Sequence, residues 1–350
     1  MMQFSQFLIN WFHINKRNLP WRDDPIPYNV WLSEIILQQT RVNQGMGYYV
    51  RFLEAFPTVY DLAKANQQEV LKLWQGLGYY SRARNLHKAA KFIVDDLEGK
   101  FPDNYKALIK LPGVGPYTAA AIASIAFNEA VPAIDGNAKR VFSRLFEIDT
   151  PIDQPDTLKK IEHEAKQLID LKSPGDFNQA VMELGATVCL PKKPDCAVCP
   201  VAAFCISYKS GSQHKLPVKI RKVKVRNRYF NYFIFKYNGK TALLERTGND
   251  IWKGLNEFPL YESEKEMDGE DLIGLAIKRW GVNSESIKKV SFSDPIKHVL
   301  THQRIYAKFI IMDLTSMPKK IKLDTNLNTI SDKAVSRLTD IFLSMDEKFL

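Results

Sequence analysis

Cysteine is almost absent from this 350-residue chain, which has four, all between residues 189 and 205. A framework of disulfides spread over the chain is therefore excluded. No apolar run is long enough to cross a bilayer, and the first residues lack a charged segment followed by an apolar core. Internal repeats and low-complexity tracts are absent too. We therefore expect a cytoplasmic protein of one or two ordinary folded domains that makes no membrane contact.

The four cysteines follow the spacing C-x6-C-x2-C-x5-C (Cys189, Cys196, Cys199 and Cys205). Structural zinc sites with four cysteine ligands usually combine two short C-x2–4-C pairs, and this chain has one. Longer gaps on either side of a single C-x2-C suit the larger [4Fe–4S] cluster. The spacing therefore favours an iron–sulfur loop over residues 189–205, with zinc and disulfides as the alternatives.

The chain is basic, with a formal net charge of +10, and most of the excess lies before residue 226. A basic region that also holds a metal cluster indicates a polyanionic partner, with nucleic acid the first candidate. Many soluble proteins are mildly basic, so charge alone does not decide the partner.

Apolar residues recur at helical spacing through the first 208 residues, which predicts an all-α domain over 1–208. The clearest predicted helices are Val30–Leu37, Leu62–Leu73, Ala83–Val94, Thr118–Phe127, Leu158–Leu168 and Asn178–Val188. A polar segment rich in Lys and Arg follows, and we interpret residues 209–228 as a basic linker.

The hydrophobic period changes to two after the linker, so a smaller α+β domain is predicted over residues 229–350. Asn238-Gly239 predicts a tight turn in a β-hairpin between strands Tyr229–Tyr237 and Thr241–Arg246. The remaining predicted elements are a strand over Gln303–Leu314 and helices over Glu270–Trp280 and Asp332–Met345.

Residues 111–127 predict a hairpin between two helices, with the sequence Leu-Pro-Gly-Val-Gly-Pro-Tyr-Thr at its start. Gly113 and Gly115 permit a tight turn, and Pro116 suits the first position of a helix. The amides of Val114 and Gly115 would then be free to bind a DNA phosphate, beside Leu111. An ordinary corner between two helices is the alternative.

Two carboxylates stand in apolar sequence. Glu34 follows Trp31 and Leu32, and burial there would raise its pKa so that it stays protonated near neutrality. Asp135 follows an apolar run and precedes a predicted helix. A protonated acid and an ionised carboxylate together can cleave a glycosidic bond. The alternatives are a solvent-facing Glu34 and an Asp135 that only caps its helix.

These motifs together resemble the MutY-type adenine DNA glycosylase family of the endonuclease III-like helix-hairpin-helix superfamily. The resemblance is carried by Leu19–Arg22, Trp31–Val42, Gly76–Tyr80, the hairpin, the Asp135 segment and the cysteine spacing. It implies a monomer that flips adenine out of double-stranded DNA where adenine is mispaired with 8-oxoguanine or guanine. It also implies the [4Fe–4S] cluster, a cation at the hairpin loop and, in a bacterium, association with the nucleoid.

The resemblance assigns roles to individual residues. Glu34 would protonate N7 of adenine, and Asp135 would stabilise the cationic sugar. Tyr117 stands where related glycosylase/lyases carry a lysine, so strand cleavage should be weak or absent. Gln39 and Tyr79 would enter the duplex near the mismatch. The adenine pocket would be lined by Arg17, Trp21, Arg22, Leu37 and Gln179, of which Trp21 and Leu37 could instead belong to the core.

The C-terminal domain resembles the Nudix-like recognition domain of this family. Its helix Glu270–Trp280 lacks the clustered carboxylates that hold magnesium, so pyrophosphate hydrolysis is not expected. Thr301 and His302 match the element that reads the damaged base, and Leu300 replaces an aromatic ring there.

Three other functions stay open. They are a bifunctional endonuclease III-like glycosylase/lyase, a non-catalytic iron–sulfur protein that binds DNA or senses redox state, and a nucleotide pyrophosphatase.

Overall fold

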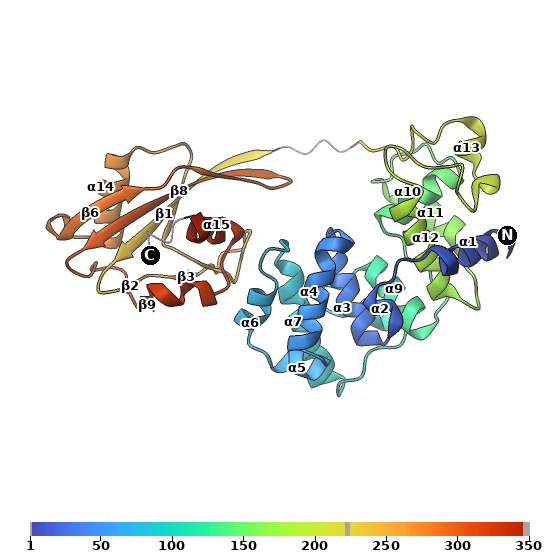
Figure 1. Cartoon of the computed structure of the whole chain (residues 1–350), viewed down its shortest axis with the longest axis horizontal. Coiled ribbons are helices and arrows are strands. Elements are labelled where there is room, and N and C mark those ends of the chain that lie inside the picture. Colours follow the sequence, from blue (N-terminus) through green and yellow to red (C-terminus); the bar gives the residue numbers. More distant parts are fainter. Residues whose placement is uncertain (1, 221–224, 346–350) are drawn as a thin grey trace. The chain divides into compact units, whose positions relative to one another are not determined.

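The computed structural model describes residues 2–220 and 225–345. The described residues form two compact units, the first from residues 1–64 and 85–221 and the second from residues 65–84 and 222–350. The first unit is helical and the second is built around a β-sheet (Figure 1). The predicted order of an all-α part followed by an α+β part is confirmed. No described helix is both long and apolar enough to span a membrane.

Proline marks the start of five helices of the first unit, because its fixed φ and missing N–H suit the first helical turn. These helices are α2 (Pro20–Asp23), α3 (Pro27–Leu37), α9 (Pro116–Phe127), α11 (Pro155–Leu168) and α12 (Pro174–Thr187). The others are α1 (Met2–Asn15), α4 (Val42–Ala55), α5 (Val59–Lys64), α7 (Ser81–Asp96), α8 (Tyr105–Leu108), α10 (Gly136–Leu145) and α13 (Ile206–Ser210).

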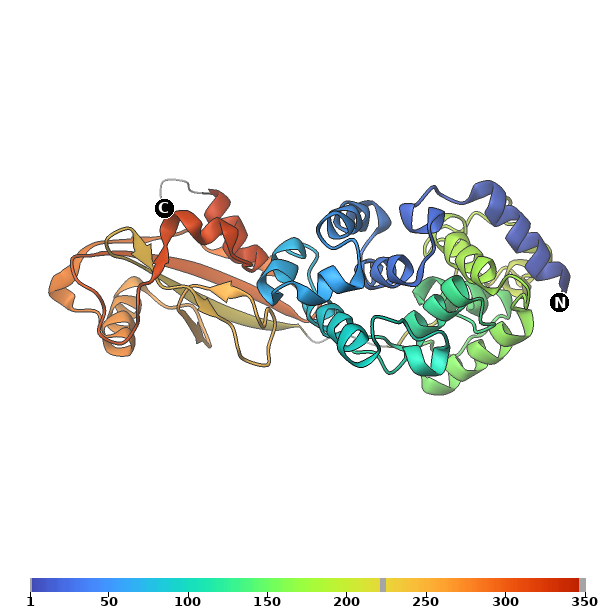
Figure 2. The ribbon, with the colours of Figure 1, turned by 90° about the horizontal axis from the view of Figure 1, so that it is seen from below.

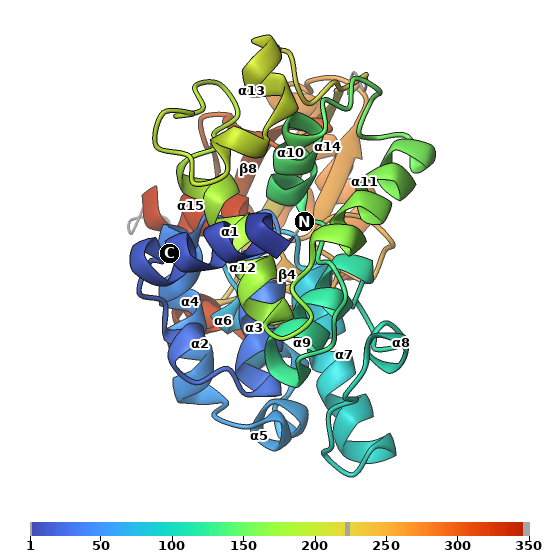
Figure 3. The same ribbon diagram turned by 90° about the vertical axis from the view of Figure 1, so that its right-hand side faces the viewer.

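The first unit has two helical groups that meet at α12. Helices α1 and α10 pack on α12, and α11 packs on α10 and α1 (Figure 3), over a core that includes Phe12, Phe142 and Phe177. Helices α3, α4 and α8 belong to the second group, where α3 and α8 pack on α9. Because α9 also packs on α12, side chains of α3, α9, α10 and α12 are brought together between the two groups.

The predicted helix Leu62–Leu73 is wrong as a single element, because the chain breaks it into α5 and α6 (Gln67–Leu73). Asn66 begins α6 with a capping box: its side chain accepts from the Glu69 amide, and the Glu69 carboxylate accepts from the Asn66 amide. A new helix start is therefore favoured here over continuation. The break lies where the chain passes from the first unit into the second.

The second unit contains a five-stranded sheet in which β1 (Arg226–Lys236) and β8 (Gln303–Leu314) pair in parallel. Strand β5 (Leu260–Ser263) pairs with the other edge of β1. Strands β6 (Ile287–Phe292) and β7 (Ile296–Val299) pair with the far edge of β8. The predicted strand Gln303–Leu314 is confirmed residue for residue.

The predicted hairpin is wrong beyond its turn. Asn238 and Gly239 form the expected tight turn with positive φ angles of 48° and 71°, and Tyr237 and Lys240 bond to each other across it. The chain then leaves β1, because both edges of that strand are occupied by β5 and β8. Its continuation forms β2 (Lys240–Thr241), paired with β9 (Thr325–Asn326), and β3 (Leu244–Glu245), paired with β4 (Asn256–Glu257).

Helices α14 (Gly269–Trp280) and α15 (Arg337–Met345) cover opposite faces of the sheet (Figure 2). The Trp280 ring of α14 lies 4.5 Å from Phe233. The Phe342 ring of α15 stacks on Phe309 at 4.0 Å. Side chains alternate across a strand, so β1 and β8 supply a core to both helices. The predicted helix Asp332–Met345 is shorter than expected, because a 3-10 turn (Leu327–Asp332) precedes α15.

Candidate active site

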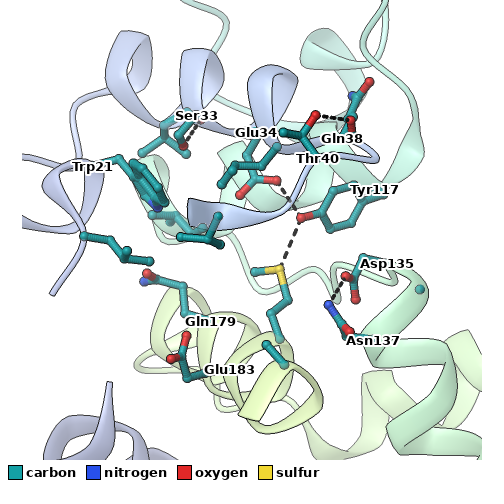
Figure 4. A pocket seen from close by; sticks show the side chains of 18 of the residues that line it. Trp21, Ser33, Glu34, Gln38, Thr40, Tyr117, Asp135, Asn137, Gln179 and Glu183 are labelled. Carbon is teal, nitrogen blue, oxygen red and sulfur yellow. Dashed lines mark hydrogen bonds between the residues drawn. The ribbon is translucent and has the colours of Figure 1, made fainter. Parts of the chain in front are cut away.

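A cavity of about 460 Å³ lies in the first unit, within the size range of small-molecule sites. Its walls come from α2, α3, α9, α12 and the start of α10 (Figure 4). All the predicted catalytic and adenine-pocket residues line it, together with Gln39: Arg17, Trp21, Arg22, Glu34, Leu37, Tyr117, Asp135 and Gln179. Residues up to 166 positions apart in sequence therefore meet at one place.

Glu34 is buried, with 8 % of its surface exposed, so it does not simply face solvent from an amphipathic helix. Burial raises the pKa of Glu34 from 4.5 to about 7. A hydrogen bond from Tyr117 and the charge of Arg22 lower this pKa, and the charge of Asp135 raises it. Glu34 can therefore hold a proton near neutral pH and give it to a bound group.

Tyr117 projects from the first turn of α9 toward Glu34 (Figure 4). Its hydroxyl lies 2.5 Å from Glu34 Oε2 and 3.2 Å from Met182 Sδ. Burial, followed by the charges of Glu34 and Asp135, raises the pKa of Tyr117 far above its usual value, so it remains a neutral phenol. The phenol orients the Glu34 carboxyl and supplies no amine nucleophile.

Asp135 both caps α10 and lines the cavity, so the two uses coexist. Its Oδ1 accepts from the Ala138 amide at 2.7 Å, and its Oδ2 accepts from Asn137 Nδ2 at 2.9 Å. Burial raises the pKa of Asp135 above its usual value, and these bonds and the charge of Arg140 oppose that rise. Unlike Glu34, Asp135 accepts from two N–H donors at a helix N-terminus, which favours its ionised form.

Glu183 is a site residue that the sequence reasoning missed. It lies on α12 at 1 % exposure and accepts from two arginines, Arg17 Nε at 2.6 Å and Arg22 Nη2 at 2.8 Å. These bonds and charges outweigh burial and lower the pKa of Glu183, so it is ionised. Arg22 also donates to Gln179 Oε1 at 3.2 Å, which fixes the orientation of that amide.

A chain of hydrogen bonds along α10 leads from Asp135 to the cysteine loop. Asn137 donates to Asp135 and accepts from Arg140 at 2.9 Å. Arg140 Nε donates to the carbonyl of Cys189 at 2.8 Å, and Arg144 Nη1 approaches Cys189 Sγ at 3.2 Å. Two buried arginines therefore fix the first cysteine relative to the active-site helix.

None of the four cysteines is in a disulfide, and all four line one apolar chamber beside α10 and α12. Among the described residues, no three His, Cys, Asp or Glu side chains are close enough to hold a single metal ion. Four thiols around a common chamber, one of them bonded to a buried arginine, fit a larger group that four thiolates surround.

The predicted hairpin forms its turn at Gly113, where φ is +77° and an added Cβ would lie 2.5 Å from Asn85 Cβ. One detail of that prediction is wrong: the Val114 amide is not free, because it donates to the Leu111 carbonyl at 3.1 Å. The side chains of Leu111 and Val114 are buried, so any contact with DNA would be through the backbone.

Gln39 and Tyr79 are exposed and have positive φ angles of 56° and 49°. Such backbone strain in residues other than glycine is often found at functional positions. In the second unit the Tyr79 hydroxyl lies 3.4 Å from Thr301 Oγ1, and His302 is exposed beside Thr301.

Known proteins that resemble this chain are DNA repair enzymes. Residues 32–170 match the model of the HhH-GPD superfamily base excision DNA repair protein. The chain is 40 % identical over 266 residues to an adenine DNA glycosylase of Buchnera aphidicola subsp. Schizaphis graminum, covering 75 % of this chain and 76 % of that one. It is 34 % identical to an adenine DNA glycosylase of Arabidopsis thaliana, covering 94 % of this chain and 60 % of the relative.

Solved structures resemble the helical part. A thermostable thymine-DNA glycosylase matches with a TM-score of 0.54 and 29 % identity, covering 59 % of this chain and 96 % of that structure. A non-covalent endonuclease III–DNA complex matches with a TM-score of 0.51 and 24 % identity, over 59 % of this chain and 94 % of that one, which indicates a shared fold.

Proposed function

This chain belongs to the adenine DNA glycosylase family, and we propose that it excises adenine paired with 8-oxoguanine or guanine in double-stranded DNA. Membership rests on relatives such as the first Buchnera protein, which is 40 % identical with 76 % of its length covered. The observation that carries the proposal is a buried Glu34, with a pKa near 7, facing Tyr117 and Asp135 across one cavity. A protonated acid and an ionised carboxylate suit hydrolysis of an N-glycosidic bond.

Glu34 is the general acid in this mechanism. An adenine flipped into the cavity takes the Glu34 proton on N7, which makes the base a better leaving group. The bond between C1′ of the sugar and N9 of adenine then breaks, and its electron pair leaves with the base. Glu34, now ionised, can take a proton from the water that adds to C1′. The proton is thereby restored to Glu34.

Asp135 stabilises the cationic sugar through its charge. An ionised carboxylate that is already oriented by Ala138 and Asn137 needs no rearrangement when positive charge develops nearby. Tyr117 positions Glu34 through the 2.5 Å bond. Because a phenol stands here in place of an amine, no Schiff base forms, and the abasic strand stays intact.

The charged residues Arg22 and Glu183 in the cavity wall position Gln179 to recognise adenine. Arg22 bonds both Glu183 and Gln179, so the amide of Gln179 has one orientation toward the cavity. An amide held in this way can recognise the donor and acceptor edge of a purine by hydrogen bonds. Trp21 supplies an aromatic wall, with its ring 5.1 Å from Tyr49.

Cys189, Cys196, Cys199 and Cys205 would hold a [4Fe–4S] cluster, which supplies a rigid crosslink and local charge when it is bound. The bonds from Arg140 and Arg144 to Cys189 support this assignment, since they fix the loop on the helix that Asp135 caps. The hairpin at Gly113 would bind a DNA phosphate, and Thr301 with His302 would read the base opposite adenine.

The test is Glu34→Gln, which keeps the shape of the side chain and removes its acid. The variant should bind an A:8-oxoguanine duplex as the wild type does and release no adenine within the assay. Gln167→Ala, on the surface of α11, is the control and should be fully active. Adenine release by Glu34→Gln at the wild-type rate would refute the assignment of the acid. The non-catalytic and pyrophosphatase alternatives require instead that the wild type itself releases no adenine.

A further inference from the structure

One face of helix α6 is bound to the rest of the second unit by polar side chains. Gln68, Lys72 and Gln75 recur four and three residues apart, so they lie on the same side of the helix and its end. We call these three residues and the four that Gln68 and Gln75 bond (Gly254, Asn256, Val335 and Asp340) the α6 seam. All seven belong to the second compact unit.

Gln68 joins the seam through both ends of its amide. Its Oε1 accepts from Asn256 Nδ2 at 2.8 Å, and its Nε2 donates to the Gly254 carbonyl at 2.9 Å. Gly254 has φ +83°, and a Cβ there would lie 3.3 Å from Leu71 Cδ1. The close approach of this backbone to α6 therefore depends on glycine.

Gln75 is bound in the same two-ended way. Its Nε2 donates to Asp340 Oδ1 at 3.0 Å, and its Oε1 accepts from the Val335 amide at 3.2 Å. Lys72 lies between the two glutamines and donates to the carbonyls of Ser331 and Lys333. An amide bonded at both ends has one orientation. The seam therefore fixes the position of α6 along the segments that it contacts.

The loop that follows the seam carries Tyr79, which is 53 % exposed. The loop is braced at Gly78, whose carbonyl accepts from Trp74 Nε1 at 3.0 Å and from Arg82 Nη2 at 3.2 Å. Tyr79 and Thr301 line a cavity of about 570 Å³ in the second unit, and their hydroxyls lie 3.4 Å apart. Two side chains that the chain supplies 222 residues apart therefore meet in the unit that the seam holds together.

We infer that Gln68 and Gln75 are positioning residues that set Tyr79 against Thr301, so that both read the base opposite adenine together. This inference rests on the proposed function and adds the residues that make its mismatch discrimination possible. The glutamines act on recognition and not on bond cleavage, because Glu34, Tyr117 and Asp135 belong to the first unit.

The test is the double variant Gln68→Ala/Gln75→Ala, assayed under single-turnover conditions on A:8-oxoguanine and A:G duplexes. The rate on A:8-oxoguanine divided by the rate on A:G should fall about tenfold, as expected if a displaced Tyr79 and Thr301 lose one or two net hydrogen bonds to the base opposite adenine. The rate on A:G should stay within about twofold of the wild type, because the catalytic cavity is unaltered. Gln167→Ala is the matched control and should leave the ratio unchanged.

Thr301→Val shows whether the two glutamines act through Thr301 or only stabilise the fold. If the glutamines act through Thr301, adding Gln68→Ala/Gln75→Ala to Thr301→Val should lower the ratio no further. If the double variant fails to fold, Gln75→Glu serves instead, since it places a carboxylate against Asp340. The inference would be overturned if the double variant lowered both release rates equally or left their ratio unchanged. It would also be overturned if the glutamine and Thr301 changes lowered the ratio independently, or if the wild type released adenine from both duplexes at the same rate. Wild-type protein that releases no adenine from either duplex would contradict the proposed function instead.

Discussion

Raising the pH through neutrality should switch off adenine release, because the buried acid loses its proton. The pKa of Glu34 is raised from 4.5 to about 7, mainly by burial. Above that value the protonated fraction falls tenfold for each pH step of one, so the rate at pH 9 should be about 100-fold below its plateau. The assay is single-turnover adenine release across pH, at constant ionic strength and saturating enzyme.

The same pKa predicts how stability changes with pH. The rise from 4.5 to about 7 corresponds to about 3 kcal/mol. The folded protein holds the proton more tightly than the unfolded chain, so this stabilisation is complete below pH 4.5 and is lost as the pH rises through 7. Glu34→Gln cannot titrate, so its melting temperature relative to the wild type should be higher at pH 8 than at pH 5.

A direct measurement of the carboxyl would refute this reasoning most simply. In protein labelled with ¹³C at glutamate side chains, the resonance that disappears in Glu34→Gln belongs to Glu34. A midpoint near 7 is predicted. A midpoint at the ordinary value of 4.5, or a flat rate from pH 6 to about 9, would show that burial does not create the acid.

Three further changes test neighbouring groups. Tyr117→Phe removes a hydrogen bond that lowers the pKa of Glu34, so the alkaline limb of the pH–rate profile should move to higher pH; an unmoved limb would contradict that bond. Asp135→Asn keeps a good N-cap for α10 but removes the charge, so the melting temperature should change little while the rate falls by about 100-fold or more; an undiminished rate would exclude electrostatic catalysis. Cys199→Ser removes one of four thiols, so purified protein should lose most of its iron and visible absorbance; full iron content would refute the ligand assignment.

Local sequence signals predicted much of the candidate active site. Apolar neighbours correctly predicted the burial of Glu34, and the helix start at Gly136 correctly predicted the capping role of Asp135. Glu183 was missed, because its role depends on Arg22 and Arg17, which lie 161 and 166 residues earlier in the chain. Its position between the core residues Val181 and Leu184 was the available signal.

Nonlocal pairing explains where sequence reasoning failed. The Asn238-Gly239 turn was correctly predicted from its two residues, but the partner of β1 was not, since β8 lies far along the chain. A strand with both edges occupied cannot also pair within its own hairpin. The break at Asn66 was readable in principle, because Asn66 and Glu69 have the spacing of a capping box.

The most direct test of the central claim is to incubate the protein with an A:8-oxoguanine duplex labelled on the adenine strand. We predict stoichiometric free adenine and a strand that stays intact until alkali cleaves it at the abasic site. A strand cleaved without alkali would indicate a lyase, and no free adenine from protein with its full iron content would contradict the account.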